Sequence, residues 1–217
     1  MDELIHGSDY VPADDVCIRI VSVRWLAYIY CMSRKYKIRD QEKLYFVTFT
    51  VIEWIDLFIR DEYRSIIVES IKYCQQNKGL DVYGYCMMTS HMHMIIGTSS
   101  HTTTLEGVIR DMKSYTSRRI REAIENSNIV HESRREWMLK MMYNAGRYNS
   151  NNNDFQLWQQ HNQPIELNTN ELIDQKLDYI HLNPVAAGFV DHPEAWLYSS
   201  ARDYSATAKG FIDLIFV

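Results

Sequence analysis

The chain has 217 residues, of which 46% are hydrophobic and 12% aromatic, and this suits one folded domain, or one domain with an extension, rather than a disordered chain. Its formal net charge of −5 argues against a general nucleic-acid coat protein, for which a basic domain is expected. No apolar run reaches the roughly 20 residues needed to cross a membrane, and the cysteines form no C-x-x-C pair. We therefore expect a cytoplasmic protein with reduced thiols and no membrane partner.

The first 31 residues differ from the rest of the chain. They lack a clear hydrophobic period, mix Gly, Pro and Asp, and end just before Met32, which a basic and polar run follows. Residues 1–31 are therefore either an N-terminal extension outside the fold or an ordinary extra helix. Residues 32–217 are expected to form the functional domain.

From residue 44 onward the hydrophobic pattern predicts a series of strands and helices. Runs rich in aromatic and β-branched residues indicate strands, Gly79 and Thr104 mark the end and the start of helices, and Asn183-Pro184 is expected to end the last one. The expected elements are a strand over 44–51, a helix over 61–77, strands over 80–88 and 91–97, helices over 104–126 and 133–143, a loop over 144–154, a strand over 155–159 and a helix from 169 or 170 to 182. This order favours an α+β fold, a ferredoxin-like or RRM-like antiparallel sheet with helices packed on one side.

Two histidines lie in the third predicted strand. His91 and His93 are two residues apart, so both imidazoles leave the same face while Met92 and Met94 pack on the other. Two neutral imidazoles side by side are half of a divalent-metal site. Taken alone, the pair is more simply explained as surface or hydrogen-bonded histidines.

A second group of functional side chains lies on the last predicted helix. Tyr179 and Asn183 are four residues apart, so the phenol and the carboxamide are neighbours on one helix face. Each also has a simpler explanation, because Tyr179 suits a core aromatic position and Asn183 a helix C-cap before Pro184.

The combination of these residues resembles the HUH endonucleases. His91-Met92-His93 is similar to their His–hydrophobic–His motif, and the segment from Tyr179 to Val185 resembles the Tyr-Ile-x-x-Asn-Pro-Val signature of the single-tyrosine HUH transposases, close to the REP-associated tyrosine transposases. The segments 85–88, 155–159 and 198–204 also match, in the right order. The resemblance runs from about residue 32 to the C-terminus and implies the HUH endonuclease fold.

The resemblance implies a metal-dependent endonuclease and strand transferase that acts on single-stranded DNA, next to a hairpin. Tyr179 would be the nucleophile that forms a 5′-phosphotyrosine, and His91, His93 and Asn183 would hold one Mg²⁺ or Mn²⁺. The enzyme would work as a monomer or homodimer in DNA transposition or a domesticated equivalent. Family members often have a basic residue after Asn-Pro-Val, where this chain has Ala186.

The predicted DNA contacts are a basic cluster and a set of aromatic residues. The cluster lies on the helix over 104–126 and consists of Arg110, Lys113, Arg118, Arg119 and Arg121. Trp158, Trp54 and Tyr204 are candidates for stacking on unpaired bases, although for Trp54 we expect core packing.

Two other functions remain open from the sequence. One is a non-cleaving DNA or RNA hairpin-binding protein derived from such a transposase, in which Tyr179, Asn183 and both histidines would have no role. The other is a metal-dependent small-molecule enzyme, which would leave Tyr179 and the basic cluster unexplained.

Overall fold

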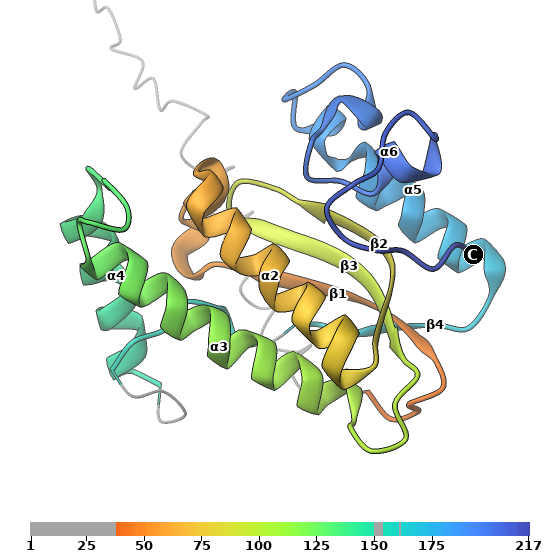
Figure 1. The fold of residues 1–217 in the computed structure, drawn as a ribbon, viewed down its shortest axis with the longest axis horizontal. Helices are drawn as coiled ribbons and strands as arrows, with labels where there is room; N and C mark the ends of the chain where they lie inside the picture. Colours follow the sequence, from red (N-terminus) through yellow and green to blue (C-terminus); the bar gives the residue numbers. More distant parts are fainter. Residues whose placement is uncertain (1–37, 150–153, 161) are drawn as a thin grey trace, which may run out of the picture. The chain divides into compact units, whose positions relative to one another are not determined.

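The structure is a computed structural model that describes residues 38–149, 154–160 and 162–217. The predicted extension over residues 1–31 lies outside the described residues. Within them, four strands form one antiparallel sheet with the order β2-β3-β1-β4 (Figure 1). The strands are β1 (Leu44–Thr50), β2 (Leu80–Met87), β3 (His91–Thr98) and β4 (Ile165–Leu167).

The helices largely follow the predicted segments. They are α2 (Asp61–Lys78), α3 (Leu105–Glu125), α4 (Arg135–Arg147), α5 (Asn170–Ala186) and α6 (Ala201–Tyr204), with short 3-10 turns η1 (Ile52–Trp54), η2 (Leu57–Ile59) and η3 (Pro193–Ala195). The Thr104 and Thr169 side chains cap α3 and α5 by accepting hydrogen bonds from backbone N–H groups, and Gly79 ends α2 in the left-handed region at φ 68°. No helix in the described part of the chain is long and apolar enough to cross a membrane.

The arrangement of these elements confirms the predicted α+β, ferredoxin-like fold class. The helix α2 connects β1 to β2, β2 and β3 form a hairpin, and β3 lies between the other two in the sheet. The chain then passes through α3 and α4 to β4 at the outer edge of β1. This is the connectivity of the ferredoxin-like β-α-β-β-α-β unit, with α4 inserted before the last strand.

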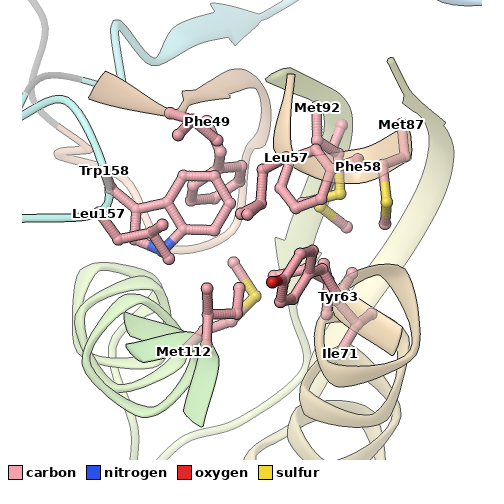
Figure 2. Close-up of a cluster of buried hydrophobic side chains, with 14 of the residues drawn as sticks. Phe49, Leu57, Phe58, Tyr63, Ile71, Met87, Met92, Met112, Leu157 and Trp158 are labelled. Carbon is pink, nitrogen blue, oxygen red and sulfur yellow. The ribbon is translucent and has the colours of Figure 1, made fainter. Parts of the chain in front are cut away.

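The sheet is covered on both faces. Met92 points from β3 into the large core that α2 and α3 complete (Figure 2), and Met94 belongs to the same core. Ile95 points to the opposite face, where it packs with Leu177 and Ile180 of α5. The two long helices thus share one face, and α5 forms a further layer on the other.

The segment before β4 differs from the predicted strand over 155–159. Trp158 makes an isolated bridge with Val51, the Gln159 N–H donates to the Thr50 carbonyl at 2.8 Å, and regular pairing resumes only at β4. Between them Gln163 has a φ of 43°, which interrupts an extended ladder. The segment therefore follows the edge of β1 without forming one strand. The loop predicted over 144–154 begins later, because α4 continues to Arg147.

The last helix does not end before Pro184 as predicted. Pro184 is buried inside the final turn of α5, and the Ala187 N–H donates to the Asn183 carbonyl at 3.0 Å. A proline removes one backbone donor, but the turn that follows it can still be helical. Asn183 is therefore a helical residue rather than a C-cap.

A buried carboxylate connects the start of α2 to the start of α4. Glu132 accepts hydrogen bonds from Arg60 at 2.8 Å and from Arg134 at 3.0 Å, and its side chain is fully buried. Burial alone would raise the pKa of Glu132, but the hydrogen bonds from Arg134 and Arg60 outweigh it and lower the pKa to about 2.

We expect Glu132→Gln to lower the free energy of unfolding by roughly 2–3 kcal/mol near pH 7, because it leaves two guanidinium groups without their carboxylate. The folded-state pKa lies below the ordinary value of 4.5, so this contribution is present above about pH 4.5 and is lost as the pH falls toward 2. Urea denaturation of the unmodified protein and of the variant, near neutral pH and at about pH 4, measures the loss of stability and its dependence on pH. Glu122→Gln is the matched control, since the ion pair of Glu122 with Arg119 is half exposed and worth at most about 1 kcal/mol. Equal losses in the two variants would contradict the assignment.

Candidate nuclease site

His93 lies in the middle of the sheet, on the face that α5 covers. It is opposite Thr48 in the β1–β3 register, and the Thr48 hydroxyl is 2.9 Å from its Nδ1. The side chain is only 5% exposed, and its Nε2 has no hydrogen-bond partner among the described residues. If Nδ1 carries the proton and donates to Thr48, Nε2 presents a free lone pair.

His91 lies beside His93 on the same face. The two ring centroids are 4.8 Å apart, and the Ser90 hydroxyl is 3.4 Å from the His91 Nδ1. Burial lowers the pKa of both imidazoles; for His93, burial, His91 and Lys176 together lower the pKa to about 3. Both rings are therefore neutral near pH 7, the state in which imidazole binds metal ions.

Tyr179 approaches the histidines from α5. Leu177 and Ile180 are buried against the sheet, which turns the Tyr179 ring toward His93 at a centroid distance of 5.2 Å. The tyrosine is nevertheless 48% exposed. The Lys176 amine lies 5.6 Å from the centre of the same ring. Tyr179 is thus an accessible phenol beside the histidine pair, rather than a core aromatic.

Asn183 is one helical turn beyond Tyr179 and is partly buried. The i, i+4 spacing puts both side chains on one face of α5. The described residues contain no cluster of three His, Cys, Asp or Glu that could hold a metal ion. The carboxamide oxygen of Asn183 is a hard donor of the kind that divalent cations accept.

The orphaned nitrogen of His93 fits a metal ligand. A buried polar atom without a partner costs about 1–3 kcal/mol, and a bound cation would remove that cost. The hydrogen bond between the Thr48 hydroxyl and the His93 Nδ1 is the kind of contact that orients a ligating imidazole. Two imidazoles with a carboxamide oxygen are a donor set that Mg²⁺ or Mn²⁺ accepts.

Two of the other motif segments, 85–88 and 198–204, connect to α5 through hydrogen bonds. Ser200 lies between Tyr85 and His181: its hydroxyl accepts from the Tyr85 N–H at 2.9 Å and is 2.8 Å from the His181 Nε2. Burial lowers the pKa of His181 to about 4. The segments 85–88 and 198–204 and the middle of the Tyr179 motif thus meet at the Ser200 hydroxyl, which connects β2 to the helix that carries Tyr179.

The burial of the two tryptophans is the reverse of what the sequence predicted. Trp158 is 5% exposed, packs against Phe49 and Phe58, and donates from Nε1 to the Thr116 hydroxyl at 3.0 Å (Figure 2). It is a core residue and presents no surface for base stacking. Trp54, expected in the core, is 58% exposed and lies edge-on to His91 with a centroid distance of 5.3 Å. No hydrophobic period distinguishes the two positions, because both are single aromatics in irregular segments.

The predicted basic cluster lies away from the histidines. The buried side of α3 shares the core with Met92, so α3 covers the sheet face opposite His93. The helix carries five cationic and four anionic side chains, which leaves it almost neutral. The Lys113 amine donates to the Gln159 carbonyl at 2.7 Å, and burial lowers its pKa to about 8. Arg119 and Arg121 pair with Glu122 and Glu125, and Arg110, although exposed, lies 3.4 Å from Asp111. Arg118 is exposed.

A family model described as "Transposase IS200 like" matches residues 45–154. The chain belongs to the IS200-like transposase family. Both histidines lie inside the matched range, and Tyr179 and Asn183 lie beyond it. Among curated protein sequences, none matches this chain.

A solved structure supports the fold of this transposase family member. The structure of a REP-associated tyrosine transposase bound to a REP hairpin has 13% sequence identity and a TM-score of 0.54, and the match covers 84% of this chain and 92% of that one. At this identity the likeness concerns the fold.

Proposed function

We propose that this transposase family member is a metal-dependent single-stranded DNA endonuclease and strand transferase that acts through a 5′-phosphotyrosine. The observation that carries the proposal is the accessible Tyr179 ring 5.2 Å from His93, whose buried Nε2 has no partner among the described residues. Membership of a transposase family supports DNA cleavage as the reaction class.

We assign the metal site to His91, His93 and Asn183. Their neutral nitrogens and carboxamide oxygen would hold one Mg²⁺ or Mn²⁺. The bound cation would polarise the phosphate and stabilise negative charge on the leaving oxygen. Thr48 would hold the His93 ring in the orientation and tautomer that ligation needs.

Tyr179 is the proposed nucleophile. Its Oη would give up its proton to water and form a P–O bond with the phosphorus, while the P–O3′ bond breaks and the 3′ oxygen takes a proton from water to become a hydroxyl. The 5′ end stays on the tyrosine, so attack by another 3′-OH restores a phosphodiester and releases Tyr179. Lys176, beside the phenol ring, would supply positive charge to the phosphate oxygens.

The proposed substrate is a single strand next to a hairpin. The REP-associated neighbour was solved with a REP hairpin, and we extend this kind of substrate to the present chain. Because α3 covers the opposite face of the sheet, its exposed Arg110 and Arg118 would contact phosphates away from the cleaved bond.

We expect Tyr179→Phe to abolish the covalent adduct while DNA binding persists, because the change removes the nucleophilic oxygen and keeps the ring that packs near Phe46. A denaturing gel of labelled single-stranded DNA, drawn from hairpins that flank the gene, detects the protein-linked 5′ product.

Tyr115→Phe is the matched control and should retain the adduct. Tyr115 is also exposed, but it lies on α3 and has Arg119 rather than an amide four residues on. An adduct that persists in Tyr179→Phe, or that disappears only in Tyr115→Phe, would identify a different nucleophile.

The metal requirement gives a second test. Cleavage should stop in excess EDTA, and Thr48→Val should raise the Mn²⁺ concentration for half-maximal adduct formation by about 10- to 100-fold, because His93 loses its orienting hydrogen bond. Thr98→Val is the control, since its hydroxyl bonds the Gly79 carbonyl at the far end of β3. Full cleavage in EDTA would rule out the metal site.

The form of the substrate gives a third test. The exposed rings of Tyr179 and Trp54 can stack on bases only when these are unpaired. We expect cleavage of single strands beside a hairpin and none of the same sequence in a complete duplex. Equal rates on the two substrates, measured side by side, would argue against the proposal.

A further inference from the structure

We propose that Trp54 is a stacking platform for one unpaired base of the bound strand, next to the phosphate held at the histidine pair. The inference rests on the proposed function and adds a residue that selects unpaired DNA. It is carried by the exposure of Trp54, by its contact with His91 and by the backbone that holds it.

The indole of Trp54 is an aromatic surface open to solvent at the candidate site. It is 58% exposed, and its ring centroid lies 5.3 Å from that of His91 at an interplanar angle of 72°. The ring therefore touches His91 edge to face and leaves much of its own surface free. A strand whose phosphate lies at His91 would bring a neighbouring base against this surface.

The backbone on either side of Trp54 is firmly anchored. The Val51 N–H donates to the carbonyl of Ser90, the residue before His91, at 2.9 Å, and the Ile52 N–H donates to the Leu157 carbonyl at 2.9 Å. Val51, Ile52 and Ile55 are all buried in the main core. Trp54 thus lies on a turn whose backbone is hydrogen-bonded to the residue that precedes the histidine strand.

The turn adopts a conformation that ordinary residues avoid. Glu53 has φ 52° and ψ 21°, and Trp54 has φ 52°, so two consecutive residues with side chains lie in the left-handed region. Such strain persists only where the surroundings impose it, and it concentrates at binding and catalytic sites. Here it projects an indole into solvent between two buried residues, Ile52 and Ile55.

The chemistry of an exposed indole suits an unpaired base of any sequence. Every base has a flat face that stacks on an aromatic ring, and this contact needs no hydrogen-bond pattern. In a duplex both faces of a base are already covered by its neighbours. Trp54 would therefore favour single-stranded DNA without choosing a base.

The test is binding of a hairpin that carries a labelled single-stranded arm, measured by fluorescence anisotropy. We expect Trp54→Ala to weaken binding by about tenfold and Trp54→Phe to retain most of the affinity, because one stacked base is lost or kept. Tyr73→Ala is the control and should bind like the unmodified protein, since Tyr73 is 57% exposed on α2, on the other face of the sheet.

An abasic nucleotide moved along the arm identifies the stacked base. At one position it should weaken binding by the unmodified protein by about tenfold and leave binding by Trp54→Ala unchanged. Unchanged affinity of Trp54→Ala, or equal losses for both proteins at every position, would overturn the proposal. The anisotropy assay measures binding and does not depend on cleavage. A protein that binds through Trp54 but forms no adduct would therefore contradict the proposed nuclease activity and leave this inference intact.

Discussion

The antiparallel pairing of β1 with β3 sets the geometry of the whole site. Met92 and Met94 are buried under α2 and α3, so alternation forces His91 and His93 onto the opposite face. The same register puts Thr48 opposite His93, where its hydroxyl meets the imidazole. A slip of one residue would remove two methionines from the core under α2 and α3 and put two imidazoles in their place. The cost of burying polar groups in that apolar core fixes the position of the histidines.

The second constraint is the position of α5 on the histidine face. Leu177 and Ile180 bury one side of the helix, and the contact between His181 and Ser200 ties it to β2. Tyr179 lies between these two residues in the sequence and is half exposed beside His93. The sequence motif around Tyr179 thus combines an accessible phenol with residues that hold the phenol in place, and only the structure separates these roles.

Strongly periodic segments were predictable from sequence, and features that depend on distant partners were not. The strands β1 and β3 and the helices α2 and α3 follow from period, capping residues and Gly79. By contrast, β4 is three residues long and follows Gln163 at positive φ, which no local pattern reveals. Trp54 is exposed and Trp158 is buried, the reverse of the expectation, because burial of a single aromatic depends on what packs against it. The α3 cations cluster in sequence, but the helix faces the wrong side of the sheet for the histidines.

In the proposed function, Tyr179 and the histidine pair form one site for phosphodiester chemistry. The most direct test is to incubate the protein with hairpin-bearing single-stranded DNA and Mn²⁺, digest the adduct with nuclease and protease, and locate the remaining nucleotide by mass spectrometry. We predict a 5′-phosphonucleotide on the peptide that contains Tyr179. A nucleotide on Tyr115 or on any other residue, or a cleaved strand with no protein attached, would contradict this account.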